Sequence, residues 1–98
     1  MFRHVVMVKW KSEVSRVERE SAAESIRTLP LKIAQIRRFA IGENEGIDKD
    51  NFDFVLVADF DNANDYAVYR DHPYHRTLME KVIRPIIATR AAIQHEVS

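Results

Sequence analysis

Two nine-residue segments of the chain alternate as β-strands do, and the centre of each is apolar on both of its faces. The first is FRHVVMVKW, residues 2–10, in which Val5 and Met7 lie opposite to Phe2, His4, Val6, Val8 and Trp10. The second is FDFVLVADF, residues 52–60, in which Val55 and Val57 lie opposite to Phe52, Phe54, Leu56, Ala58 and Phe60. A sheet with one wet side would alternate apolar with polar residues. We therefore expect both faces of this sheet to be covered.

The segments between and after these strands predict the other elements. Ser12 precedes EVSRVERESAAESIRTL, residues 13–29, in which apolar residues recur at roughly helical spacing among charges: Val14, Val17, Ala22, Ile26 and Leu29. We expect an amphipathic helix here that begins after Ser12 and covers one face of the sheet with these residues. IRRFAIG, residues 36–42, alternates as a second strand does, and the polar segment GENEGIDKDN, residues 42–51, is expected to be a loop. A fourth strand is predicted over residues 88–97.

Two prolines divide the helical region between the third and fourth strands. Asp61 or Asn62 can cap a helix over residues 63–71. This helix should break near His72, because the residue before a proline is pushed out of helical geometry. Pro73 suits the first position of a new helix, which we expect to end near Arg84, just before Pro85.

The resulting order, β-α-β-β-α-β, predicts an α+β fold: a ferredoxin-like split βαβ unit with a four-stranded antiparallel sheet and helices on one face. Residues 1–98 should form one domain. The other face of the sheet would remain open, and a second copy of the chain is the economical cover, since most soluble oligomers are symmetric. We expect a homodimer whose open sheet faces meet, which makes a dimeric α+β barrel.

Composition removes several classes of function. Lys and Arg number 15, equal to the 15 Asp and Glu, so the basic excess of a general nucleic-acid binder is missing. No cysteine is present, and no apolar run approaches the ~20 residues that span a bilayer. Neither a phosphate-binding glycine loop nor a dinucleotide fingerprint occurs, so no cofactor is expected. The default expectation is a cytoplasmic protein without nucleic-acid or membrane partners.

The segment YRDHPYHRTLMEKV, residues 69–82, holds the main candidates for chemistry. His75 would lie in the first turn of the helix that Pro73 begins, where the helix dipole disfavours an added proton. A neutral imidazole can act as a general base at neutral pH. Tyr69, at the end of the preceding helix, could donate a hydrogen bond to a substrate carbonyl or a developing enolate.

Structural explanations stand beside these chemical ones. His72 can satisfy backbone groups at the helix break, and Tyr69 can simply pack with its hydroxyl in water. His4 shares its strand face with Val6 and Val8, which fits a hydrogen-bonded core histidine as well as a pocket residue. A metal site is not expected, because Pro73 interrupts the helix that would align the two histidines.

Several motifs together resemble the stress-responsive A/B-barrel (Dabb) domain family of dimeric α+β barrels. They are HVVMVKW, LPLKI, IGEN, DFVLVADFDN and above all YRDHPYH, which follow one another in the family's order from about His4 to Pro85. The resemblance implies a ferredoxin-like protomer and an obligate dimer. It leaves function open, because the family includes plant stress proteins that assemble without known catalysis.

Another branch of the family resembles plant polyketide cyclases, which perform cofactor-free aldol chemistry with a tyrosine and the second histidine of this element. On that pattern the catalytic roles fall on Tyr69 and His75, with His4 and His72 in supporting positions. Val6, Val8, Leu56 and Ala58 would line a pocket for the apolar part of a small, polyketide-like substrate.

Three functions therefore remain open. The first is a small-molecule binder or a cofactor-free cyclase- or isomerase-like enzyme that uses Tyr69 and His75. The alternative is a non-enzymatic stress or assembly protein in which the histidine corner is structural. A third, weaker hypothesis follows the cofactor-independent monooxygenases among other dimeric α+β barrels.

Overall fold

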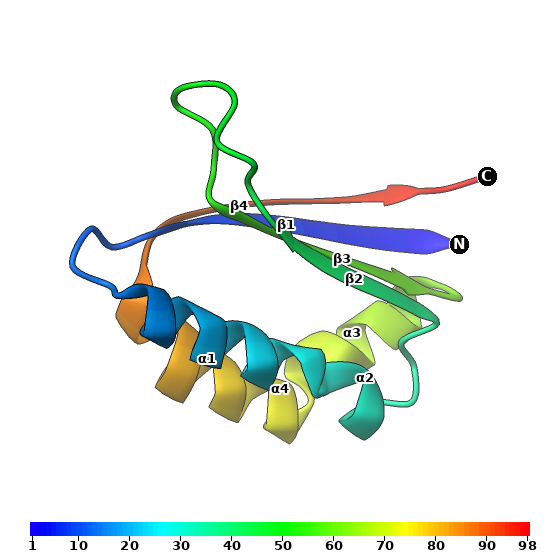
Figure 1. The fold of residues 1–98 in the computed structure, drawn as a ribbon. Helices are drawn as coiled ribbons and strands as arrows, with labels where there is room; N and C mark the ends of the chain where they lie inside the picture. Colours follow the sequence, from blue (N-terminus) through cyan, green and yellow to red (C-terminus); the bar gives the residue numbers. More distant parts are fainter.

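A computed structural model describes all 98 residues and confirms the ferredoxin-like arrangement. The elements follow in this order: β1 (Phe2–Trp10), α1 (Arg16–Arg27), α2 (Leu29–Lys32), β2 (Arg38–Glu43), β3 (Phe54–Phe60), α3 (Ala63–Asp71), α4 (Pro73–Leu78), the π-helical turn η1 (Met79–Ile83), the 3-10 turn η2 (Arg84–Ile86) and β4 (Ile87–Glu96). The strands form one antiparallel sheet in the order β2-β3-β1-β4. All helices lie on one side of it, while the connection between β2 and β3 rises from the other side (Figure 1).

The core lies between the sheet and the helices. Strand β3 supplies Phe54, Leu56, Ala58 and Phe60, all of them buried, and β1 supplies His4 and Val8. Helix α1 packs Ala22, Ala23 and Ile26 against them. The alternation of β1 and β3 therefore predicts correctly which side chains share the face that the helices cover.

The register of the strands aligns side chains in rows across the sheet. His4 pairs with Ala58 on β3 and with Gln94 on β4, whereas Val8 pairs with Phe54 and Arg90. Paired residues of antiparallel strands point to the same face. Gln94 and Arg90 therefore lie on the helix-covered face with His4 and Val8.

The opposite face of the sheet is apolar at its centre and has no covering element. Val5, Val55 and Val57 are half-buried there, while Met7 and Ile93 are 38% and 59% exposed. The sequence predicts that both faces of the sheet are covered, but a single chain covers only the face that packs against the helices.

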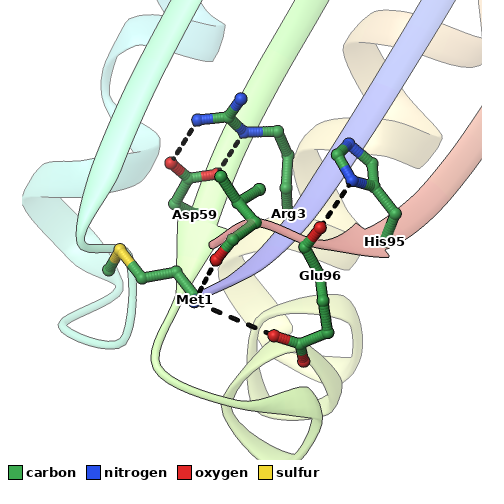
Figure 2. A network of polar contacts seen from close by, with 6 residues as sticks. Met1, Arg3, Asp59, His95 and Glu96 are labelled. Atoms are coloured by element: carbon green, nitrogen blue, oxygen red, sulfur yellow. Dashed lines mark hydrogen bonds and ion pairs between the residues drawn. The ribbon is translucent and has the colours of Figure 1, made fainter.

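One end of this open face carries an ion pair. Arg3 and Asp59 face each other in register, with Arg3 Nε 2.7 Å from Oδ1 and Nη2 2.9 Å from Oδ2 of Asp59 (Figure 2). The bonds from Arg3 lower the pKa of Asp59, a carboxyl group that is only 2% exposed. Beside it, the amino group of Met1 donates to the carbonyl oxygen of Val97 and so fixes the chain ends together.

The first helix starts later than its sequence suggests. Ser15, not Ser12, is the N-cap, because Ser15 Oγ accepts the backbone N–H of Glu18 while the Glu18 carboxylate accepts that of Ser15. Val17 is 74% exposed, so its expected place on the buried face is wrong. Val14 is buried just before the helix.

The helix break forms where Pro73 predicts it. His72 has extended dihedral angles, φ −61° and ψ 133°, between α3 and α4, and Asn62 caps α3 by accepting the backbone N–H of Asp65. The second helix is not regular to Arg84: it widens into the π turn η1 and then tightens into η2. None of the helices is both long and apolar enough to cross a membrane.

Candidate functional site

A cavity of about 680 Å³ lies between the helix-covered face of the sheet and the segment from α3 to η2. Strands β1 and β3 contribute an apolar floor through Val6, Val8, Phe54 and Leu56. Six of the eight side chains that the sequence singles out line it: His4, Val6, Val8, Leu56, Tyr69 and His75. A volume of this size suits a small organic molecule.

The other two residues lie outside the cavity lining. Ala58 is completely buried in the core beneath the helices, although it sits on the expected face of β3. His72 turns its ring to its own helix: Nδ1 accepts the backbone N–H of Tyr74 at 3.1 Å and caps α4. Through this bond His72 satisfies a backbone N–H group at the helix break, which is the structural role considered for it from the sequence.

The register of β1 and the helix break bring three candidates for chemistry together. The ring centroids of Tyr69 and His75 are 4.4 Å apart, and those of His4 and Tyr69 are 6.0 Å apart. Tyr69 and His75 come from the two sides of the break, and His4 comes from the sheet beneath them. All three line the same cavity.

His75 has the tautomer of a general base. Its Nδ1 lies 3.0 Å from the carbonyl oxygen of Arg70, which can only accept, so Nδ1 carries the proton. The Nε2 atom of the neutral ring then holds a free lone pair. Burial lowers the pKa of His75, the bond to Arg70 partly opposes this, and the charge of Arg90 lowers the pKa further. Burial, rather than the helix dipole considered from the sequence, is the main cause.

His4 is also neutral at pH 7. It is 3% exposed, and its Nδ1 lies 2.8 Å from the amide nitrogen of Gln94, which donates to it. The proton of the neutral ring is therefore on Nε2. Burial, and after it the charge of Arg90 and the neighbouring His75, together lower the pKa of His4 to about 4. The two histidines therefore differ: His4 can donate a hydrogen bond from Nε2, whereas His75 can accept a proton on Nε2.

Tyr69 keeps its proton and presents its hydroxyl to the cavity. Burial raises the pKa of Tyr69 above its usual range. No protein group accepts a hydrogen bond from the hydroxyl, yet no fully enclosed polar atom of the chain lacks a partner. The hydroxyl therefore reaches the open space of the cavity, where a ligand oxygen could accept its proton.

Several lining residues escaped the sequence reasoning. Tyr66, three residues before Tyr69 on the same helix face, places its ring centroid 4.8 Å from that of His4. Met79 and Ile83 of the π turn line the cavity, and this turn has no sequence signature. Arg90 lines it from β4, on the face that strand alternation assigns to it once the register with β1 is known.

The corner brings together no group of three or more His, Asp or Glu side chains that could hold a metal ion. Asp71, the acidic neighbour of His72, is paired instead with Arg70 and Arg76 at 3.0 and 3.1 Å. The hydrogen bonds from these arginines lower the pKa of Asp71 to about 2.

Comparison with known proteins agrees with this architecture. The family model described as Stress responsive A/B Barrel Domain matches residues 2–97. A search of curated proteins by sequence found no match.

Solved structures with the same fold include proteins of known and unknown function. A dimeric ferredoxin-like protein of unknown function from Thermobifida fusca is 31% identical, with a TM-score of 0.89 over 98% of this chain and 90% of that one. A dimeric protein of unknown function and ferredoxin-like fold from Bacteroides fragilis is 27% identical, with a TM-score of 0.82 over 98% and 95%. The hydroxynitrile lyase of Passiflora edulis is 15% identical, with a TM-score of 0.89 over 99% and 93%.

Proposed function

Because this chain belongs to the stress-responsive A/B-barrel domain family, we propose that it is a homodimer that binds a small apolar or aromatic molecule between its sheet and helices. We further propose that Tyr69 and His75 perform cofactor-free acid–base catalysis on this molecule, of the cyclase, lyase or isomerase type. The observation that carries this is the meeting of Tyr69 and His75 over an apolar floor.

The open sheet face supports the homodimer. Its apolar centre, with Met7 and Ile93 exposed, would be hidden by the same face of a second copy. The relatives from Thermobifida fusca and Bacteroides fragilis are themselves described as dimeric. Light scattering should give about twice the 11.4 kDa mass of one chain, and a monodisperse monomer at micromolar concentration would contradict the dimer.

The tautomers of His75 and His4 support different roles for the two residues, a general base and a hydrogen-bond donor. His75 Nε2 would take a proton from a carbon next to a carbonyl group, and the electron pair left behind would move onto the carbonyl oxygen. Tyr69 would donate a hydrogen bond to the resulting enolate oxygen, with His4 Nε2–H as a second donor. The likeness to the hydroxynitrile lyase, at 15% identity, supports the fold alone.

Hydrogen–deuterium exchange tests this chemistry without knowledge of the natural substrate. The protein is incubated with benzylacetone in deuterium oxide near neutral pH, and loss of the protons next to the carbonyl is followed by proton NMR. A positioned general base typically contributes a factor of about 10²–10⁴, so the wild type should exceed free imidazole at equal concentration. His75→Asn and Tyr69→Phe should lose this acceleration.

His95→Asn is the matched control, because His95 lies opposite Arg3 at one end of the open face, on the other side of the sheet from the cavity and outside its lining. Exchange that is equal in the wild type and in His75→Asn would refute catalysis by His75. If benzylacetone then also failed to perturb the NMR signals of cavity residues, the non-enzymatic assembly function would be favoured. In that case His75→Asn should only lower the melting temperature.

A further inference from the structure

The rim of the cavity carries an excess of positive charge in a chain whose formal net charge is zero. Four arginines and two carboxylates line it, all of them exposed: Arg70, Arg76, Arg84, Arg90, Asp71 and Glu80. With the histidines neutral, the rim has two more positive than negative charges. A cleft with low-dielectric walls concentrates such a potential and attracts anions.

Some of these arginines already form an ion pair with a carboxylate, and others do not. Arg70 and Arg76 both bind Asp71, so their guanidinium groups are committed to the helix corner. Arg84 and Arg90 form no ion pair and no hydrogen bond with any other side chain, and of these two only Arg90 lies near enough to His4, Tyr69 and His75 for its charge to act on their pKa values. A planar guanidinium of this kind can bind a carboxylate through two parallel hydrogen bonds.

Arg90 also lines the same cavity as the reacting groups. It stands on the helix-covered face of β4, opposite Val8 of the cavity floor. Its positive charge favours the deprotonated form of His4, Tyr69 and His75 alike, although burial still raises the pKa of Tyr69. The row of Arg90 and Val8 lies four residues, or about 13 Å along the strand, from the row of His4 and Gln94. One small molecule can therefore reach from Arg90 to His4, and His75 lines the same cavity.

We propose that the cavity binds a carboxylate-bearing apolar or aromatic molecule, and that Arg90 holds its carboxylate while its apolar body lies over Val6 and Val8. This inference rests on the proposed function and narrows its substrate class to organic acids with several bonds between the carboxylate and the reacting carbon. Arg90 acts as a binding residue for the charged end, and Tyr69 and His75 face the other end.

A pair of ligands that differ only in charge tests the proposal. The probes are γ-phenylbutyrate and γ-phenylbutyramide, and the readout is the fluorescence of Trp10, the only tryptophan of the chain, which lines the cavity. A hydrogen bond to a charged partner contributes enough for about a tenfold preference. The wild type should therefore bind the carboxylate about ten times more tightly than the amide, and added salt should reduce this difference.

Substitutions assign the preference to one residue. Arg90→Gln should bring the two dissociation constants to within about twofold of each other, because it weakens binding of the carboxylate more than binding of the amide. Arg90→Lys should keep part of the preference, because it retains the charge without the fork geometry. Arg19→Gln, a half-buried arginine on α1 outside the cavity, is the matched control and should behave as the wild type.

The possible failures are distinct. Equal affinity of the wild type for both probes, or a carboxylate preference that survives in Arg90→Gln, would overturn the role of Arg90 while leaving small-molecule binding intact. Absence of binding by both probes would overturn the inference together with the proposed binding function.

Discussion

Protonation of His4 should make the stability of the protein depend on pH in a defined window. The folded protein holds His4 neutral, with a pKa of about 4, whereas an unfolded chain has the ordinary value near 6.5. Between these two values the unfolded state binds more protons than the folded state. The free energy of unfolding therefore falls as the pH is lowered from about 6.5 to about 4, and His4 causes no further loss below that.

The size of the effect follows from the width of the window. A difference of one pKa unit between the folded and the unfolded state corresponds to about 1.4 kcal/mol. Protonation of His4 therefore lowers the free energy of unfolding by about 2 kcal/mol between pH 7 and pH 4.5. His75 adds to the loss in the same direction, because its pKa is also lowered. The carboxyl groups of Asp59 and Asp71 act mainly below this range, since their lowered pKa values give stability that is lost only as they are protonated.

Urea unfolding of wild type and His4→Gln at pH 7 and pH 4.5 isolates this contribution. Glutamine can still hydrogen-bond to Gln94 but does not titrate. The wild type should lose about 2 kcal/mol more than His4→Gln between the two pH values, and His95→Gln should lose as much as the wild type. All samples need the same protein concentration, because the stability of a dimer depends on it. Parallel losses in wild type and His4→Gln would refute the assignment of a buried neutral histidine.

Three further substitutions test separate features. Tyr69→Phe should change the free energy of unfolding by less than about 1 kcal/mol in urea, because the lost hydroxyl bonds to no protein group; a larger loss would mean that the hydroxyl has a structural role. Asp59→Asn should cost about 1–3 kcal/mol at pH 7, since Arg3 loses its two-point contact, and an unchanged urea midpoint would contradict this. Ser15→Ala should cost about 1 kcal/mol by removing the helix cap, whereas Ser12→Ala should cost much less in thermal melts.

The sequence predicted the sheet and the helix break because both depend on local chemistry. Alternation fixed which residues of β1 and β3 share a face, and Pro73 fixed the break at His72. The predicted start of α1, directly after Ser12, was wrong because Ser12 and Ser15 are both acceptable caps. The reciprocal bonds between Ser15 and Glu18 decide between them, and the three-residue spacing of this pair was the signal that could have shown it.

The site was only partly predictable, because it depends on contacts between distant segments. Tyr69 and His75 are neighbours along the chain, but their meeting with His4 depends on how α3 and α4 lie on β1. Arg90 could not be placed until the register of β4 against β1 was known. His72 shows the opposite case, because its bond to Tyr74 is local and agrees with the structural role that the sequence allowed.

The π turn η1 forms part of the cavity wall, and a change in its length would alter this wall without changing the sheet. A π turn has i→i+5 bonds, one residue longer than those of an α-helix, so loss of one residue between Met79 and Ile83 could return the wall to α-helical geometry. A π turn accommodates its extra residue locally, so such a deletion would change which side chains of the turn, Met79 and Ile83 among them, face the cavity above an unchanged floor. Related chains could thus acquire different ligand preferences through the length of a single turn, while the strands and the Tyr69–His75 corner keep their sequence.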